Sequence, residues 1–157
     1  VSSKGKIFYS QERLGINEKP FMIYKFRTMV RDAEKNGPQL SSENDARITP
    51  FGRFMRKTRL DELPQFFNVL KGDMSVVGAR PIVGKELEDF YRESAGRYCS
   101  MKPGITGPWQ VGKRSDTEDY SERVRMDDWY ILNYSLWNDI KIIGKTVVAM
   151  LKGNGAY

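Results

Sequence analysis

The first thirty residues alternate β-prone stretches with a turn-prone one. Residues 7–9 and 21–29 are rich in aromatic and β-branched side chains, and residues 15–20, which begin with glycine and end with proline, separate them. This pattern predicts a β-hairpin. In the second strand, the period of two places Lys25 and Arg27 on one face. Two interpretations fit: the pair reaches one anion together, or both side chains are solvated on an exposed face.

Downstream, apolar residues recur at helical spacing. Thr49-Pro50 is a start signal for a helix over 51–58, and Pro81 predicts another helix through 91. This second helix would face inward with Ile82, Leu87, Phe90 and Tyr91. Further helices are expected at about 117–134 and 136–152, with a short strand or turn at 74–77. The pattern predicts a mainly helical α+β domain in which a small antiparallel β-hairpin precedes a cluster of helices.

Residues 58–72 hold the most informative motif. An apolar run at 63, 66, 67 and 70 has helical spacing, Gly72 ends it, and Pro64 fits only a first turn. Thr58 or Asp61 would cap this helix, so that Asp61 and Glu62 lie at its N-terminus. Such a position lowers a carboxylate's pKa and presents backbone N–H groups to a phosphate. A simpler interpretation makes Asp61 only an N-cap and Glu62 only a first-turn charge.

Basic residues and one tryptophan supply further candidate contacts to an anion. Two prolines and three glycines make residues 101–114 a shaped loop whose backbone can approach a ligand closely. Within it, Trp109 could stack on a base or a sugar. The side chains that could meet phosphates are Arg59, Arg80, Lys102, Lys113 and Arg114. The loop is not a Walker loop and lacks G-x-G-x-x-G, which disfavours those nucleotide-binding folds.

The last two predicted helices carry a second acidic pair and an apolar stripe. Asp127-Asp128 falls mid-helix among arginines, which favours salt bridges within the fold over catalysis. The apolar side expected for that helix consists of Tyr120, Val124, Trp129 and Ile131. In the final helix, a broad stripe either packs in the core or lies against something apolar. It consists of Ile140, Ile142, Ile143, Val147, Val148, Met150 and Leu151.

The composition favours an anionic partner and excludes several kinds of catalytic and metal site. The 157 residues suffice for one domain, predicted to span 1–157. A net charge of +6 favours an anionic partner: nucleic acid, a phosphorylated small molecule or an anionic membrane surface. The chain has no histidine, which excludes histidine bases and nearly every zinc site. Cys99 alone allows no internal disulfide, and no apolar run approaches the roughly 20 residues that span a bilayer.

Several motifs, taken in order, resemble the bacterial sugar transferase family. They are FMIYKFRTM at 21–29, DARITPFG at 45–52, RLDELPQ at 59–65, GDMSVVGARP at 72–81, KPGITG at 102–107 and GAY at 155–157. They cover nearly the whole chain in order, so the set is more specific than any one motif. This family comprises the monotopic phosphoglycosyl transferases that open capsule, exopolysaccharide and glycoprotein pathways.

The resemblance implies transfer of a phospho-sugar from a UDP-sugar to polyprenyl phosphate, with release of UMP and with Mg²⁺ as cofactor. It implies that Asp61 is the nucleophile and holds the phospho-sugar covalently. Glu62 would assist through the metal, which both carboxylates would bind, or by deprotonating the acceptor, and Arg80 would hold a phosphate. The residue chemistry agrees, because a carboxylate is a reasonable nucleophile in a chain without histidine, and Mg²⁺ prefers carboxylate and phosphate oxygens.

Three departures from the family pattern stand out. Ala79 replaces a usual proline, and Gly112-Lys113 replaces a usual Ser-Gly; both changes are expected to be tolerated. Family members also carry a hydrophobic re-entrant membrane helix just before the region of residues 4–9, and this chain starts at Val1 without it. We therefore expect a soluble catalytic fragment of a protein that acts at the cytoplasmic face of the bacterial inner membrane.

Two other functions fit parts of the sequence. A basic nucleic-acid-binding module would use Trp109, Tyr24 and the scattered basic residues, but the chain has neither a recognition-helix pattern nor an aromatic RNA-binding sheet motif, so nucleic acid is not an expected partner. A catalytically inactive protein could dock on anionic lipid through the helices near 51–59 and 136–152. Intact Asp61, Glu62 and Arg80 weigh against that loss of activity.

Overall fold

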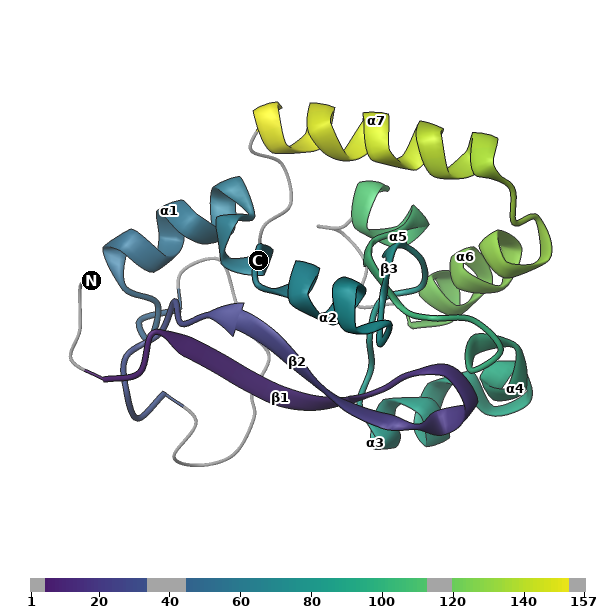
Figure 1. The fold of residues 1–157 in the computed structure, drawn as a ribbon, viewed down its shortest axis with the longest axis horizontal. Helices are drawn as coiled ribbons and strands as arrows, with labels where there is room; N and C mark the ends of the chain where they lie inside the picture. The colour runs from purple at the N-terminus through teal and green to yellow at the C-terminus, as the bar shows by residue number, and fades with distance from the viewer. Residues whose placement is uncertain (1–4, 34–44, 113–119, 153–157) are drawn as a thin grey trace.

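The computed structural model describes residues 5–33, 45–112 and 120–152. An antiparallel hairpin comes first, followed by helices and a small second sheet (Figure 1), which confirms the predicted α+β class. The elements are β1 (Phe8–Leu14), a 3₁₀ turn (Ile16–Glu18), β2 (Pro20–Phe26), α1 (Pro50–Thr58), a 3₁₀ turn (Leu60–Glu62), α2 (Gln65–Lys71), β3 (Ser75–Val77), α3 (Gly84–Glu86), a π-helical turn (Leu87–Tyr91), a 3₁₀ turn (Arg92–Ser94), α4 (Ala95–Tyr98), β4 (Gly104–Thr106), α5 (Pro108–Val111), α6 (Tyr120–Leu132) and α7 (Leu136–Lys152).

The predicted hairpin is confirmed, although its second strand ends earlier than expected. β2 stops at Phe26, and Met29 forms only an isolated bridge. The buried Asn68 of α2 holds the hairpin against the helices. Its side-chain nitrogen donates to the carbonyl of Met22 (2.8 Å), and its side-chain oxygen accepts from the N–H of Tyr24 (3.2 Å). This fully buried amide therefore fixes the position of β2 relative to the acidic motif.

The acidic motif lies in a turn between two helices, which corrects the predicted helix start. Thr49 caps α1 as predicted, by accepting a hydrogen bond from the Gly52 N–H (2.9 Å). Arg59 then adopts the left-handed conformation (φ 56°), which ends α1, and the next three residues form a 3₁₀ turn. α2 begins only after Pro64, and no side chain caps it. The prediction of Asp61 as an N-cap is therefore wrong.

A second, two-stranded sheet supports the residues around Arg80. β3 pairs in parallel with β4, a strand that the sequence pattern did not predict. A Cβ atom at Gly78 would lie 2.7 Å from the Gly104 nitrogen, and one at Gly107 would lie 2.0 Å from the Gly78 carbonyl oxygen. The glycines are needed because these backbones pack directly on each other. The backbone of this loop was expected to approach a ligand closely. In the structure, its glycines instead lie against the backbone at Gly78.

The segment after β3 carries much of the core. Its helix begins at Gly84 instead of the predicted Pro81, because Val83 is still extended (φ −86°, ψ 158°). Phe90 was predicted to face inward but is 42% exposed, and it stacks on Tyr120. The buried cluster formed here consists of Ala79, Ile82, Leu87, Tyr91, Tyr98 and Cys99, of which Ile82, Leu87 and Tyr91 were predicted.

The most buried residues of α6 lie outside its predicted apolar side, although the predicted Val124 and Ile131 are partly buried against the two core clusters. Its buried residues are Arg123, Asp127 and Tyr130, whereas Trp129 is 53% exposed. The helix packs against α4, α5 and the π-helical turn. The polar face can be buried because it finds polar partners there, such as the Tyr91 hydroxyl, which donates to Asp127. An apolar periodicity cannot reveal such a face.

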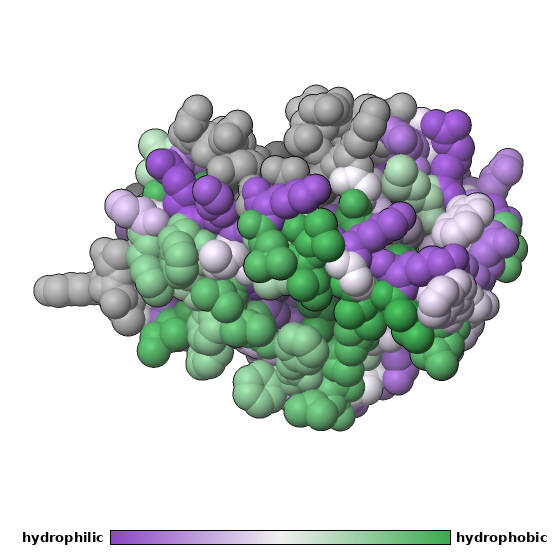
Figure 2. All heavy atoms as spheres, turned by 90° about the horizontal axis from the view of Figure 1, so that it is seen from above, coloured by the Kyte–Doolittle hydropathy of each residue, from purple (hydrophilic) through white to green (hydrophobic). Residues whose placement is uncertain are grey.

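α7 has its predicted bounds but leaves most of its apolar stripe exposed. It packs on α1, α5, β3 and β4, and Ile142 is its buried residue. Ile140, Val147 and Leu151 are 50%, 51% and 83% exposed. Figure 2, which looks onto the side where α7 lies, shows hydrophobic residues gathered over a continuous area. Because most of the stripe is exposed, the structure favours the second predicted alternative, in which the stripe lies against something apolar outside this core. None of the described helices is long and apolar enough to cross a membrane.

Candidate active site

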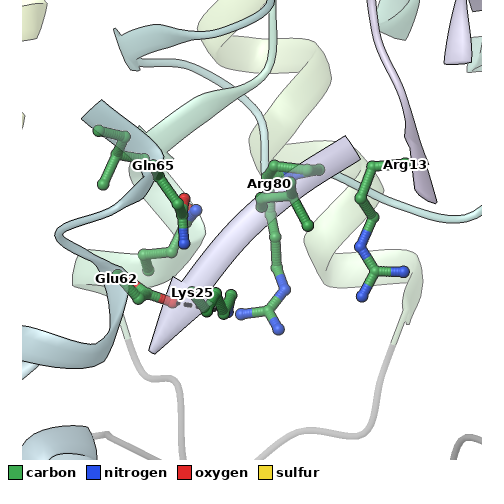
Figure 3. Close-up of a pocket in the computed structure, with 9 residues that line it drawn as sticks. Arg13, Lys25, Glu62, Gln65 and Arg80 are labelled. Atoms are coloured by element: carbon green, nitrogen blue, oxygen red, sulfur yellow. Dashed lines mark hydrogen bonds and ion pairs between the residues drawn. The ribbon is translucent and has the colours of Figure 1, made fainter. Parts of the chain in front are cut away.

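Three cations from separate elements meet one carboxylate in a cleft beside the acidic motif. Arg13 comes from β1, Lys25 from β2, Glu62 from the turn after α1, and Arg80 follows β3. Figure 3 shows the two guanidinium groups side by side, next to the pair of Lys25 and Glu62. The excess of positive charge suits an anionic ligand. The cleft is completed by Ile23, Gln65, Pro81, Ile105 and Gln110.

Arg13 is a cleft residue that the sequence analysis missed. In the hairpin register, Tyr9 lies opposite Lys25 and Gln11 lies opposite Ile23, so alternation places Arg13 on the same face as Lys25. Its guanidinium donates to Gln11 Oε1 (2.8 Å). A first strand predicted to end at residue 9 does not reach Arg13. The hairpin register is the signal that would have found it.

Asp61 is nearly inaccessible, with 9% of its surface exposed. Burial and the neighbouring charge of Glu62 raise the pKa of Asp61 to about 6, while Lys25 and Arg56 oppose the rise. The pKa lowering predicted for a helix N-terminus is therefore not found: Asp61 lies in the turn before α2, and burial and Glu62 raise its pKa instead. A poorly solvated carboxylate that ionises near neutral pH is a candidate nucleophile.

Glu62 forms an ion pair with Lys25, with 3.0 Å between Oε1 and Nζ. Both side chains are partly buried, so water screens the pair less than it would at the surface. Lys25 was expected to share an anion with Arg27. Arg27 does not line the cleft, and its Nε donates to the carbonyl of Lys6 (2.7 Å). The strand therefore brings Lys25, but not Arg27, to this cleft.

Arg80 enters the cleft with Trp109 against it. The guanidinium carbon of Arg80 lies 5.5 Å from the centroid of the Trp109 ring, and the Tyr98 hydroxyl donates to the Arg80 carbonyl (2.7 Å). Burial and the like charge of Arg123 lower the pKa of Arg80, while Glu62 raises it. An arginine keeps its proton under such an influence, so Arg80 remains a cation at neutral pH. Trp109 itself does not line the cleft.

The other predicted phosphate ligands do not line the cleft. Arg59 is buried, and its Nη2 donates to the carbonyl of Gln110 (2.9 Å), which ties the turn that bears Asp61 to α5. Lys102 is exposed and lies near Gly72. Arg114 lies outside the described residues, as does Lys113. The Arg59 guanidinium is therefore used for a hydrogen bond within the fold, and Arg59 does not line the cleft.

The second acidic pair is held within the fold. Asp127 is 1% exposed and accepts a hydrogen bond from the Tyr91 hydroxyl (2.7 Å). Asp128 forms an ion pair with Arg97 (2.8 Å). Burial raises the pKa of Asp127 to about 6, although Tyr91 and Arg123 oppose the rise. These contacts agree with the structural role expected for this pair.

Asp61 and Glu62 are the carboxylates that could hold a metal ion beside the cleft. Across residues 5–33, 45–112 and 120–152, no three acidic or cysteine side chains gather into a protein-only metal site. Mg²⁺ does not need one, because it keeps several waters and commonly binds one or two carboxylates together with substrate phosphates. Two adjacent carboxylates beside a cationic cleft fit that requirement.

The chain matches the family model described as bacterial sugar transferase over residues 1–153. It belongs to the bacterial sugar transferase family. It is 49% identical over 168 residues to an undecaprenyl-phosphate galactose phosphotransferase of Salmonella typhimurium, covering 98% of this chain and 35% of that protein. It is 47% identical over 163 residues to the galactosyl transferase CpsE of Streptococcus agalactiae (97% and 36%). It is 39% identical over 171 residues to the exopolysaccharide production protein ExoY of Sinorhizobium fredii (99% and 75%).

Family membership confirms the resemblance that the motifs indicated. The chain spans about a third of the length of the first two relatives and three quarters of ExoY. Four of the motifs converge in its structure: the one at 21–29 supplies Lys25, the one at 59–65 supplies Glu62, the one at 72–81 supplies Arg80 and the one at 102–107 supplies Ile105. Segments far apart in the sequence therefore build one cationic cleft.

Proposed function

We propose that the chain is the catalytic part of a phosphoglycosyl transferase. It moves a phospho-sugar from a UDP-sugar to a polyprenyl phosphate, such as undecaprenyl phosphate, and releases UMP, which begins capsule or exopolysaccharide assembly at the membrane. The observation that carries the proposal is a buried, ionisable Asp61 beside a cleft with Arg13, Lys25 and Arg80. Two relatives support both substrates: the undecaprenyl-phosphate galactose phosphotransferase of Salmonella typhimurium, and a UDP-N-acetylgalactosamine-undecaprenyl-phosphate N-acetylgalactosaminephosphotransferase of Aeromonas hydrophila, which is 42% identical to this chain.

The transfer takes two steps on the same aspartate. A carboxylate oxygen of Asp61 attacks the phosphorus that carries the sugar, the bond from that phosphorus to the bridging oxygen breaks, and UMP leaves with the electron pair. The phospho-sugar stays on Asp61 as an acyl phosphate. A phosphate oxygen of the lipid then attacks the same phosphorus, the acyl phosphate bond breaks, and Asp61 returns as a carboxylate.

The cleft cations make the attack of one anion on another feasible. Arg13 and Arg80 offer planar guanidinium groups, which bind phosphate oxygens through two N–H groups at once. Lys25 adds a third charge beside Glu62. Neutralising the charge that develops on the transferring phosphoryl oxygens is the main catalytic requirement of phosphoryl transfer. Glu62 serves either as a metal ligand or as the base that takes a proton from the acceptor phosphate.

Mg²⁺ is the proposed cofactor, held by Asp61, Glu62 and phosphate oxygens of the donor. When bound, it supplies further charge neutralisation at the phosphoryl oxygens. The fit rests on the donor set: two adjacent carboxylates, of which Asp61 has its pKa raised by burial and by the charge of Glu62. A nearby divalent cation lowers the pKa of such a carboxylate and so favours its ionised form. The other positive charges of the cleft are the side chains of Arg13, Lys25 and Arg80.

The exposed side of α1 and α7 is the proposed membrane-facing surface. Phe51 and Phe54 of α1 are 52% and 53% exposed, α7 packs beside this helix, and Val147 and Leu151 of α7 are also exposed. Figure 2 shows hydrophobic residues gathered on this side. A helix with an apolar face and basic flanks lies in the interface of an anionic membrane. Such contact would bring the cleft to a lipid-borne phosphate at the cytoplasmic face.

Intact-protein mass spectrometry tests the chemistry. With Mg²⁺ and a panel of UDP-sugars, the chain should gain the mass of one phospho-sugar with the matching donor. Asp61→Asn should gain none, and Asp89→Asn, which changes an exposed aspartate, should behave as wild type. Failure of both the chain and the full-length protein to form the adduct would reject the proposal. An adduct that persists in Asp61→Asn would reject the nucleophile.

Vesicle flotation tests the membrane-facing surface. The chain should float with vesicles that contain anionic lipid, and Val147→Glu together with Leu151→Glu should reduce binding about tenfold, because charges would enter the apolar interface. Ile16→Glu, at an exposed apolar residue of the hairpin turn, should have little effect. Equal losses for both changes would show that α7 is not the docking surface.

A further inference from the structure

The guanidinium of Arg80 is held by an aromatic ring. Among the described residues, none accepts a hydrogen bond from this guanidinium, and its close contact is the Trp109 ring at 5.5 Å. The backbone beneath it is fixed, because the Tyr98 hydroxyl donates to the Arg80 carbonyl and the Gly104 N–H donates to the Ala79 carbonyl (2.8 Å). A carboxylate partner would occupy the N–H groups that a phosphate needs. An aromatic face holds the cation and leaves those groups available.

A second guanidinium lies against the same ring. The guanidinium carbon of Arg123 is 5.2 Å from the Trp109 centroid and 5.7 Å from the Tyr120 centroid, and the residue is 5% exposed. Its nearest carboxylate, Glu86, is 3.8 Å away, and its Nε and Nη2 have no hydrogen-bond partner in the described part of the chain. Burial lowers the pKa of Arg123, but Tyr91, Asp127 and Glu86 outweigh this and raise it, so the buried charge is compensated by its surroundings. It still repels Arg80.

We propose that Trp109 is a positioning residue that holds the guanidinium of Arg80 in the cleft, where Arg80 binds an anion. Trp109 was expected to stack on a base or a sugar. The structure instead gives its ring two arginine contacts, and it does not line the cleft. The inference rests on the proposed function only where it names the anion, which is the diphosphate of the donor.

Binding of inorganic pyrophosphate, measured by calorimetry without sugar donor or lipid, tests this role. Trp109→Leu should weaken binding about tenfold, and Trp109→Phe, which keeps a weaker π face, should lose only about threefold. Trp129→Leu, the same change at an exposed tryptophan, should leave the affinity unchanged. In an Arg80→Gln background, Trp109→Leu should cause no further loss, because a positioning residue acts only through its partner.

Three results would overturn the inference. They are an unchanged affinity in Trp109→Leu, an equal loss with and without Arg80, and an absence of measurable pyrophosphate binding by the wild-type chain. If Trp109→Leu does not fold, Trp109→Phe takes its place in the cycle with Arg80→Gln, and its threefold loss must likewise vanish. An effect that depends on Arg80, in a protein that never forms the acyl phosphate, would reject the proposed function and leave this inference standing.

Discussion

The two acidic pairs of this chain, Asp61-Glu62 and Asp127-Asp128, have much in common. In each, the first aspartate is buried, and burial raises its pKa to about 6. In each, the second acid forms an ion pair with a basic side chain, at 3.0 Å and 2.8 Å. Neither the residue types nor the direction of the pKa change separates the two pairs.

The surroundings of each buried aspartate make the difference. Asp127 accepts a hydrogen bond from Tyr91 and is enclosed between α6 and the core. Asp61 does not line the cleft, but its neighbour Glu62 does, together with an excess of cations. A perturbed carboxylate is a candidate nucleophile only where an anionic substrate can bind next to it. The charge of the adjoining cleft, more than burial, distinguishes the proposed catalytic acid from the structural one.

The largest expected effect is a loss of catalytic activity, and we expect it for the first acidic pair only. Asp61→Asn should lower the rate of UMP release at least about a thousandfold, because the amide cannot form the acyl phosphate. Tyr91→Phe, which removes the partner of Asp127, should keep the rate within about tenfold of wild type. The assay follows UMP release from the matching UDP-sugar. Similar rates for the two variants would remove the functional distinction between the pairs.

The pH dependence of adduct formation sharpens the comparison. In the proposed reaction only ionised Asp61 attacks phosphorus, and without metal its pKa is raised to about 6. Because bound Mg²⁺ would lower this pKa, the single-turnover rate should level off at or below about pH 6 and fall at lower pH. Rapid-quench mass spectrometry measures this profile. A rate that still rises steeply above pH 7 would mean that the attacking group is not Asp61.

Stability should respond to Asp61 in the opposite direction from activity. Because the pKa of Asp61 is higher in the folded chain than its ordinary value of 3.8, the folded state binds the proton more tightly. The resulting destabilisation is absent below about pH 4 and complete above about pH 6. Asp61→Asn should thus raise the free energy of unfolding at pH 7.5 by up to about 3 kcal/mol, and the gain should disappear at pH 4. Urea unfolding at both pH values measures it, and a loss of stability at pH 7.5 would contradict the sign.

The second pair should show smaller effects, confined to stability. Tyr91→Phe leaves a buried carboxylate without its hydrogen-bond donor, which should cost about 1–3 kcal/mol. Asp128→Asn should cost less than about 1 kcal/mol, because the side chain of its partner Arg97 is 47% exposed. Urea unfolding of both variants at pH 7.5 gives the order. A larger loss for Asp128→Asn would mean that the exposed ion pair dominates.

Local signals in the sequence predicted those parts of the fold that neighbouring residues decide. Thr49 caps α1 through a side chain three residues from its partner, and α7 has its predicted bounds because one apolar periodicity runs through it. The start of α2 was missed, because the left-handed conformation of Arg59 interrupts a run that reads as helical. β4 was missed because a three-residue strand among glycines has no apolar pattern of its own.

In the candidate site, too, some residues were predicted correctly from the sequence and others were not. The motifs named Lys25, Glu62 and Arg80 in advance, and all three line the cleft. Arg59 and Trp109 were also named, but they contact the chain instead, since Arg59 bonds to a backbone carbonyl and Trp109 lies against Arg80. Side-chain type indicates which groups can bind an anion. It does not indicate whether the fold uses them for its own contacts.

By itself, the sequence determined the family, the hairpin, the helix at each end of the helical part and the presence of an acidic pair among cations. These follow from residue identity and short-range periodicity, which act over a few positions. Only the tertiary structure decided that Arg13 joins the cleft, that Asp61 is buried enough for a raised pKa and that Asp127 is enclosed. Register, burial and charge balance depend on groups that are distant in sequence, so no local pattern contains them.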